Sequence, residues 1–192
     1  GYTVDFFAET ADMAVLCRNN APLIAMAYAL IGRGVAAHVL GREIGEGMLK
    51  LIDKMNATDI DMLIERFDKY FSREVQKAEK KGRNRRVATL DDQKTCLEVF
   101  IDNLTETNRS IAGLKRQISR IFDEDAAGVT LSSIHKAKGR EWENVAILDR
   151  ELMPSPYATK PWQALQEKNL EYVAITRAKV NLVYINSDDW AK

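Results

Sequence analysis

Short apolar runs and helically spaced apolar positions alternate near the start of the chain. Met13 to Cys17 is an unbroken apolar run, which is typical of a buried strand. Apolar positions between Leu23 and Ile31 then recur three and four residues apart, and this spacing predicts a helix. A second apolar run, Val35 to Leu40, follows Gly34. Because a strand, a helix and a second strand follow one another at this length, we expect a parallel βαβ unit.

After Gly41 the apolar positions keep helical spacing only. Four amphipathic helices are predicted around residues 44–55, 60–71, 97–104 and 111–122. Thr58 and Asp61 have the spacing of a capping box at the start of the second helix. A basic, glycine-containing stretch, Lys77 to Arg86, interrupts the pattern and is expected to form a loop between helices. Residues 42–125 are therefore predicted to form an all-helical insertion.

Strand-like patterns return at Gly128. The remaining predicted elements are a strand, a polar loop, a strand, a helix and a strand, over residues 129–131, 132–141, 145–148, 163–178 and 181–185. The simplest architecture is an α/β fold with a parallel sheet and helices on both faces. Residues 1–41 and 126–192 would form this split domain, which the helical insertion interrupts.

Composition and charge narrow the possible functions. The chain is 46% hydrophobic, which is ample for a buried core, and its 28 basic and 28 acidic residues give a net charge of zero. Any nucleic-acid contact must therefore be local. The longest apolar stretch, Ala21 to Leu30, falls short of the ~20 residues that span a membrane, so no membrane partner is expected. Cys17 and Cys96 lie far apart with no metal-ligand spacing, which predicts no metal site and a reducing, cytoplasmic setting.

The polar loop after the predicted strand at residues 129–131 is a candidate ligand site. Open parallel sheets bind ligands where their strands end. In this loop Ser133 offers a hydroxyl, Lys136 and Lys138 offer charge, and Gly139 allows close backbone approach. The same composition is also typical of a solvated turn, and composition alone leaves both interpretations open.

Two arginines adjoin predicted strands. Arg18 follows the strand Met13 to Cys17, and Arg177 lies at the end of the last predicted helix. A cation at a helix C-terminus most often complements the helix dipole, which is a structural role. The functional interpretation is anion binding: two arginines at the same edge of the sheet could converge on one phosphate.

The chain lacks one nucleotide-binding motif. None of its ten glycines is followed by Lys-Ser or Lys-Thr, so no G-x-x-x-x-G-K-[ST] segment exists. The chain cannot form a P-loop by itself, and we predict that it does not hydrolyse ATP alone.

Three segments together resemble motifs of UvrD/Rep-type superfamily-one DNA helicases. Motif V is similar to VTLSSIHKAKGREW at residues 129–142, motif VI to NLEYVAITRAK at residues 169–179, and motif IV to VLCRNNA at residues 15–21. The three occur in the family's order. The resemblance implies a RecA-like sheet, the second of two such motor domains, and a helical insertion that is a reduced DNA-contacting subdomain. ATP with Mg2+ would lie between this domain and an N-terminal P-loop domain, which holds the Mg2+.

The resemblance also assigns roles to individual residues. Arg18 and Arg177 match the arginines that reach the γ-phosphate, and would be catalytic. Glu141 matches the acid that contacts the ribose, with Gly139 beside it at the ATP. The residues that would contact single-stranded DNA are Ser133, His135, Lys136 and Lys138. Three positions depart from the family: Cys17 replaces an aromatic that stacks on adenine, and Arg140 and Trp142 replace Leu and Phe.

The sequence thus predicts the C-terminal motor domain of an ATP-dependent DNA helicase. Its expected partners are single-stranded and duplex DNA and the P-loop domain. Arg83, Arg85 and Arg86 would contact the phosphates of duplex DNA; the alternative is that their stretch is only a solvated loop. A helicase–nuclease motor module and a non-catalytic DNA-binding or adaptor protein remain alternatives. Gly1 in place of an initiator Met, with a strand soon after it, suggests a fragment of a longer protein.

Overall fold

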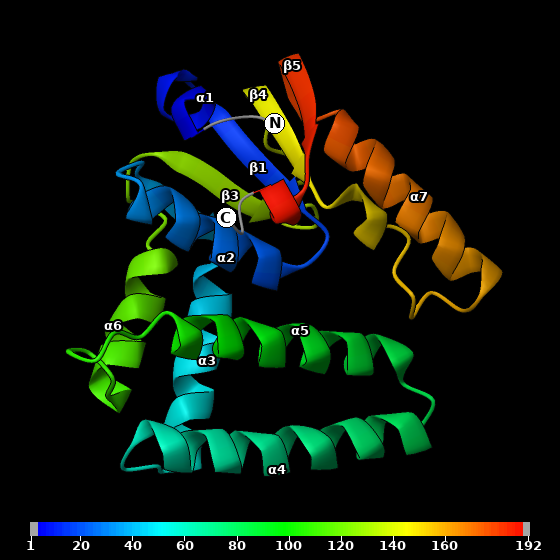
Figure 1. The fold of residues 1–192 in the computed structure, drawn as a ribbon. Helices are drawn as coiled ribbons and strands as arrows, with labels where there is room; N and C mark the ends of the chain where they lie inside the picture. The colour runs from blue at the N-terminus through cyan, green and yellow to red at the C-terminus, as the bar shows by residue number, and fades with distance from the viewer. Residues whose placement is uncertain (1–3, 190–192) are drawn as a thin grey trace. The chain divides into compact units, whose positions relative to one another are not determined.

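A computed structural model describes residues 4–189, which form five strands, seven α-helices and two short 3-10 helices (Figure 1). In chain order the elements are α1 (Val4–Glu9), β1 (Met13–Cys17), α2 (Asn20–Gly32), β2 (Ala37–Leu40), α3 (Arg42–Met55), α4 (Ile60–Lys80), α5 (Asn84–Asp102), α6 (Ile111–Ile121), β3 (Val129–Ser133), β4 (Trp142–Leu148), η1 (Arg150–Leu152), α7 (Pro161–Ile175), β5 (Ala178–Ile185) and η2 (Ser187–Asp189). They divide into two compact units, Gly1–Gly41 with Asp123–Lys192 and Arg42–Phe122.

The first unit, called the α/β unit below, is built on a parallel sheet with the strand order β2-β3-β1-β4-β5. The central strand β1 pairs with β3 on one side and β4 on the other, and all five of its residues are buried, as in a strand covered on both faces. Helix α2 lies against β1, β2 and β3, whereas Leu170 and Ala174 of α7 pack in a core cluster with Ala14 and Leu16 of β1 (Figure 1). The predicted α/β fold with a parallel sheet is confirmed.

Two element boundaries in this unit differ from the prediction. Strand β3 extends through Ser133 and β4 begins at Trp142, so the polar loop comprises residues 134–141. Helix α7 ends at Ile175 instead of Ala178, because the chain enters β5 at Ala178, which pairs with Trp142. Arg177 therefore lies in the short connection between α7 and β5.

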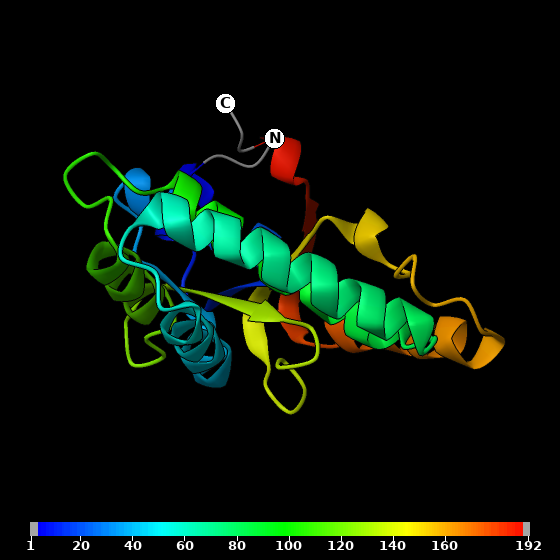
Figure 2. The same cartoon turned by 90° about the horizontal axis from the view of Figure 1, so that it is seen from below.

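The second unit, called the helical unit below, contains α3 to α6. Helices α4 and α5 lie side by side (Figures 1 and 2), and their apolar faces are buried. Phe122, the last residue of this unit, packs against α5: the centroids of its ring and the Phe100 ring lie 6.2 Å apart. The predicted capping box at Thr58 is wrong by one residue: Asp59 is the N-cap, and its carboxylate accepts from the Met62 N–H at 2.8 Å.

The basic stretch is not the long loop that the sequence predicts. Helix α4 continues to Lys80 and α5 begins at Asn84, so only Lys81, Gly82 and Arg83 connect them. Gly82 has a φ of +59°, a left-handed conformation that glycine adopts readily, and this lets the chain reverse within three residues. Charge spacing alone could not predict this tight turn, because lysine and arginine are good helix formers.

Candidate functional site

The loop 134–141 is held on the sheet by two apolar side chains. Ile134 and Ala137 are fully buried in the core cluster, three residues apart. The Ile134 N–H donates to the Cys17 carbonyl at 3.0 Å, and the Ala137 N–H donates to the Ser133 carbonyl at 3.0 Å. The charged or titratable residues between and after these anchors are exposed: His135, Lys136, Lys138, Arg140 and Glu141. A fixed backbone therefore presents mostly cationic groups to solvent.

Two of the predicted loop residues have special positions. Ser133 lies at the end of β3 and is only 6% exposed, whereas His135, two residues later, is exposed to solvent. Gly139 has a φ of +81°, while a Cβ added there would meet nothing within 4 Å. A glycine is therefore favoured at 139 by backbone conformation and not by lack of space.

Arg18 is fixed by a carboxylate on α7. Its Nε donates to Oε2 of Glu167 and its Nη2 donates to Oε1, both at 2.9 Å, which is a bidentate ion pair. Glu167 is buried, and its Oε2 also accepts from the Ser155 N–H at 3.0 Å. The pair joins the end of β1 to the first half of α7.

The pKa of Glu167 reflects these partners. Burial by itself raises the pKa of this carboxyl, but hydrogen bonds from Arg18 and from the Ser155 N–H, with the charges of Arg18 and His135, lower it below its ordinary value. Glu167 is therefore ionised at neutral pH, opposite Arg18. His135, a predicted DNA-contacting residue, lies close enough to Glu167 to contribute to this electrostatic field.

Arg177 has oxygen partners without a full charge. Its Nε donates to the Val173 carbonyl at 3.0 Å, its Nη1 to the Arg140 carbonyl at 3.0 Å and its Nη2 to Thr176 Oγ1 at 3.1 Å. The first of these bonds caps the C-terminus of α7, which is the structural role expected of a helix-end cation. The second ties α7 to the end of the loop 134–141.

The prediction that Arg18 and Arg177 share one edge of the sheet is wrong. Arg18 follows β1 at the carboxyl edge, whereas Arg177 precedes β5 at the amino edge. The physical reason is that α7 connects two parallel strands, so it begins near one edge and ends near the other. Both guanidinium groups nevertheless contact α7, one at Glu167 and the other at the Val173 carbonyl. These two residues are six positions apart, which is about 9 Å along the helix axis.

The remaining ATP-side positions group with Arg177. Glu141 is exposed directly before β4, where the Trp142 N–H donates to the Arg177 carbonyl at 3.0 Å. Trp142, one of the departures from the family pattern, is 8% exposed and packs in the core cluster as an apolar aromatic should. Cys17 is fully buried, so it offers no surface on which a base could stack.

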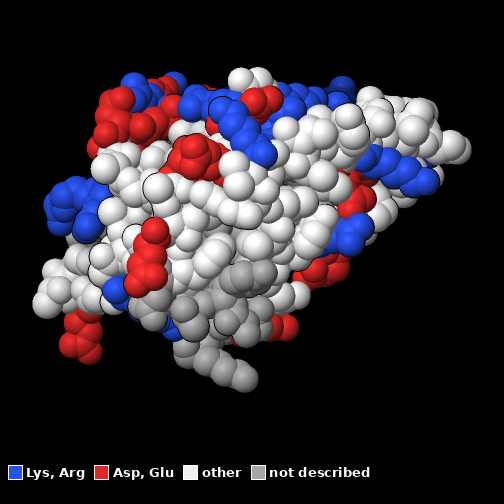
Figure 3. All heavy atoms as spheres, turned by 90° about the horizontal axis from the view of Figure 1, so that it is seen from above, with Lys and Arg blue, Asp and Glu red and all other residues white. Residues whose placement is uncertain are grey.

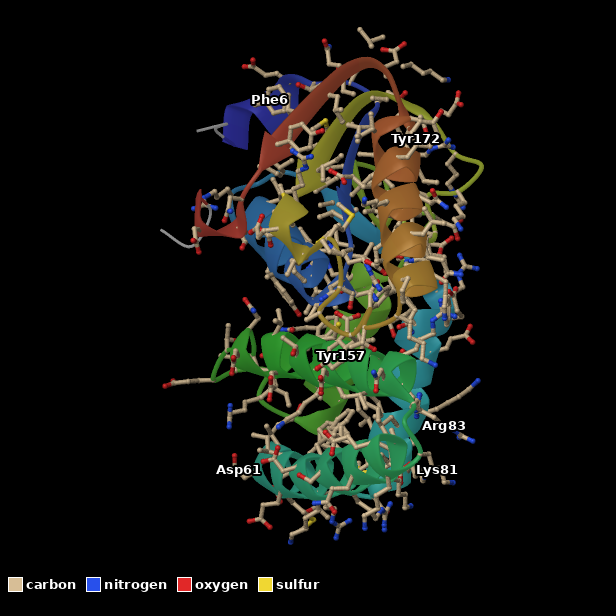
Figure 4. The ribbon with its side chains drawn as sticks, turned by 90° about the vertical axis from the view of Figure 1, so that its right-hand side faces the viewer. Phe6, Asp61, Lys81, Arg83, Tyr157 and Tyr172 are labelled. Carbon is tan, nitrogen blue, oxygen red and sulfur yellow. The ribbon has the colours of Figure 1, made fainter. Side chains whose placement is uncertain are left out.

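The basic side chains of the helical unit extend from the α4–α5 turn, where Lys81 and Arg83 project from the ribbon (Figure 4). All of the basic residues in this stretch are exposed: Lys77, Lys80, Lys81, Arg83, Arg85 and Arg86. Arg85 and Arg86 occupy the first turn of α5, where the helix dipole disfavours cations. In contrast, basic and acidic residues are interspersed among uncharged atoms on the face shown in Figure 3.

Within residues 4–189 we find no group of three or more His, Cys, Asp or Glu side chains that could hold a metal ion. None of the helices in that same range has both the length and the apolar character needed to cross a membrane.

Comparison with protein families identifies this arrangement. The family model of the UvrD-like helicase C-terminal domain matches residues 48–188. The chain belongs to the UvrD-like helicase C-terminal domain family. The predicted resemblance is thereby confirmed, and at the level of the family the chain is a DNA helicase domain. The match includes the loop 134–141 and Arg177 but begins after Arg18, so a role for Arg18 rests on its motif and its geometry.

Glu167 is the residue of this site that sequence reasoning missed. A usable signal was present, because Glu167 lies three and seven residues before Leu170 and Ala174, on the stripe of α7 that faces the core. A carboxylate on such a stripe needs a cationic or hydrogen-bonding partner.

Proposed function

We propose that this chain is the C-terminal motor domain of an ATP-dependent DNA helicase, in which Arg177 completes an ATP site whose P-loop lies on another domain. The observation that carries the proposal is that Arg177 is fixed beside Glu141 at the amino edge of the sheet in a UvrD-like helicase C-terminal domain. Phosphoryl transfer develops charge on the γ-phosphate oxygens, and fixed guanidinium groups stabilise that charge.

The ATP side of the site would use groups near the C-terminal end of α7. Arg177 would contact the γ-phosphate, and the adjacent Glu141 carboxylate would accept from a ribose hydroxyl. Gly139 would allow the nucleotide to approach the loop backbone. Mg2+ would be held by the P-loop domain, since the described residues of this chain offer no metal-binding cluster.

The DNA side of the proposal concerns two exposed basic regions. His135, Lys136 and Lys138 would contact the backbone of single-stranded DNA from the loop 134–141, because cations on a fixed backbone suit phosphate contacts. Ser133 would contribute little to this DNA contact, because it is only 6% exposed. The basic α4–α5 turn would contact duplex phosphates through Arg83, Arg85 and Arg86.

The outward side of α7 supports the proposal of a partner domain. Leu165 and Tyr172 are 59% and 69% exposed, and Trp162 is 53% exposed on the same helix. Figure 4 shows Tyr172 on the outer side of α7. Large apolar groups gathered at one surface mark interaction sites. We assign this surface to the P-loop domain, because Arg177, the proposed contact to the γ-phosphate, lies just after the C-terminal end of the same helix.

The test is an assay of the intact protein that contains this chain and its P-loop domain. We expect ATP hydrolysis stimulated by single-stranded DNA, and ATP-dependent separation of a duplex. Cleavage of the DNA in the same assay would identify the motor module of a helicase–nuclease. DNA binding without ATP turnover would contradict the motor proposal and indicate an adaptor.

A further inference from the structure

Arg18 lies at the topological switch point of the sheet. The chain leaves β1 through α2 toward β2, and it leaves β4 through α7 toward β5, so the connections from these two neighbouring strands run in opposite directions. Open parallel sheets bind ligands outside the carboxyl ends of the strands at such a point. Arg18 is the first residue after β1 and is therefore placed where this rule expects a ligand.

Glu167 holds one edge of the Arg18 guanidinium. A guanidinium has five N–H donors in a plane, and Glu167 accepts one from Nε and one from Nη2, both at 2.9 Å. The carboxylate is held from a second side, because its Oε2 also accepts from the Ser155 N–H at 3.0 Å. The remaining N–H groups, two on Nη1 and one on Nη2, form the end of a side chain that is 21% exposed. That end can donate two parallel hydrogen bonds to a pair of phosphate oxygens.

The loop 134–141, which contacts DNA in the proposed function, begins beside Arg18. The ends of β1 and β3 are paired in the sheet, and the Ile134 N–H donates to the Cys17 carbonyl at 3.0 Å. Arg18 and the exposed His135 thus begin the connections of neighbouring strands, which lie about 4.8 Å apart. His135 also lies close enough to Glu167 for its charge to lower the pKa of that carboxyl. A DNA strand whose phosphates contact His135 therefore runs beside Arg18.

We propose that Arg18 binds a phosphate of single-stranded DNA at the switch point, through the guanidinium end that Glu167 leaves free. This inference rests on the DNA side of the proposed function and extends the DNA path from the loop 134–141 to the end of β1. It gives Arg18 a different ligand from the one that its motif implies, because the γ-phosphate contact assigned to Arg177 lies at the opposite edge of the sheet.

The test is the Kd of the intact helicase for a fluorescent single-stranded oligothymidine, measured by anisotropy without nucleotide. In the double variant Arg18→Met with Glu167→Gln, uncharged side chains replace both partners, so no buried charge loses its partner and the net charge is unchanged. A loss of affinity then reports a directed contact and not general attraction. We expect Kd to rise about 10-fold or more, as for lost hydrogen bonds to a charged group.

ATP hydrolysis by the same double variant separates a DNA contact from an ATP contact. At saturating oligothymidine, kcat should stay within about threefold of the parent, because a residue that only binds DNA is not needed once DNA is saturating. The oligothymidine concentration that gives half-maximal stimulation should rise together with Kd. A lower kcat with an unchanged Kd would assign Arg18 to ATP and overturn the inference.

A matched control is the second arginine–carboxylate pair on α7. Arg150 Nε donates to Glu171 Oε1 at 2.7 Å, and the Arg150 side chain is 59% exposed. Its guanidinium lies 5.2 Å from the centre of the Tyr184 ring on β5, the edge strand farthest from β2 and β3. We expect Arg150→Met with Glu171→Gln to keep the parental Kd. An equal loss of affinity in both double variants would reflect a general change in α7 and overturn the inference.

A second variant serves if the double variant does not fold, which circular dichroism shows. Arg18→Lys keeps a cation beside Glu167 but cannot donate from a planar fork, so its Kd should also rise. A parental Kd in a folded Arg18→Lys variant would contradict the bidentate phosphate contact.

Variants of the loop separate this inference from the proposed function. Lys136→Ala with Lys138→Ala should also raise the Kd for oligothymidine. If the loop variant loses affinity while the Arg18 variants keep the parental Kd, the inference is wrong and the loop contact stands. If only the Arg18 variants lose affinity, the inference holds and the loop contact is wrong. If the parent does not bind oligothymidine, the DNA side of the proposed function is wrong and the inference falls with it.

Discussion

The arginines of the two units differ in how they are held. In the α/β unit, Arg18 is paired with a buried carboxylate and Arg177 donates to three oxygens of the chain. In the helical unit, Arg83, Arg85 and Arg86 are exposed around a tight turn. A fixed guanidinium is suited to one transition state, whereas exposed cations attract phosphates of any sequence in a salt-dependent way. In the proposed function, the first unit therefore carries the ATP chemistry of Arg177, and Arg83, Arg85 and Arg86 of the second unit contribute salt-dependent contacts to duplex DNA.

The largest effect is expected from Arg177. In the intact helicase, Arg177→Ala should lower ATP turnover by about 10³-fold or more, as for loss of an arginine finger, and leave DNA binding largely unchanged. Arg177→Lys should restore little, because an ammonium cannot replace a bidentate fork. ATPase assays and DNA titrations check this.

Arg177 also caps α7, so a loss of stability is expected in the same variant. Losing its bonds to the Val173 and Arg140 carbonyls should lower the free energy of unfolding by about 1–2 kcal/mol. If Arg177→Ala unfolds the domain and no separate kinetic defect remains in the folded fraction, Arg177 is only a helix-end cation.

The exposed arginines should act through salt-dependent DNA affinity. Each phosphate contact contributes about −0.9 to the slope of log affinity against log salt. Replacing Arg83, Arg85 and Arg86 together by Ala should therefore flatten the slope for duplex DNA by up to about 2.7, with much less change for single strands. If the plots of log affinity against log salt for duplex DNA are parallel for the variant and the parent, the turn does not contact duplex phosphates and only adds solubility.

The difference between these two groups of arginines was only partly predictable from the sequence. Apolar runs such as Met13–Cys17 predict the buried strands of a parallel sheet because both faces of such strands are covered. Motif order predicted the family. The tight α4–α5 turn was not predictable, since lysine and arginine fit a helix as well as a loop.

The geometry of the site depended on contacts that no local pattern contains. Arg18 and Glu167 are separated by 149 positions in the chain, and only the path of α7 across the sheet brings them together. The same path places Arg18 and Arg177 at opposite edges. Because α7 connects two parallel strands, the placement of these arginines at opposite edges was predictable from the sequence. The pairing of Arg18 with Glu167 was not, because no local pattern contains it.

A smaller effect concerns the stability that the Arg18–Glu167 pair contributes. Glu167→Gln should lower the free energy of unfolding by about 2 kcal/mol at pH 7, because it weakens buried hydrogen bonds to a charged group. The pKa of Glu167 is lowered in the folded chain, so this contribution is present above its ordinary value of 4.5 and is lost as the pH falls through the folded value. Urea unfolding at pH 7 and below pH 4 measures it; a difference that grows on acidification contradicts the pairing.

The smallest effect is expected from Gly139, whose left-handed backbone conformation lies in the loop 134–141. Gly139→Ala should cost about 1 kcal/mol, because a Cβ is disfavoured at a φ of +81° even in open space. Gly47, in α3, is the matched control: it also has nothing within 4 Å of an added Cβ but no positive φ, so Gly47→Ala should stabilise by about 0.5–1 kcal/mol. Equal effects at both glycines would mean that the loop does not require its left-handed residue.

One reconstitution tests most directly whether this chain supplies Arg177 to an ATP site that it cannot form alone. ATP hydrolysis is measured with single-stranded DNA for the isolated chain, and for the chain joined to its P-loop domain with and without Arg177→Ala. We predict a rate equal to the buffer blank for the chain alone, DNA-stimulated turnover for the joined protein, and loss of that turnover in the variant. DNA-stimulated hydrolysis by the purified chain alone, unaffected by Arg177→Ala, would contradict the account.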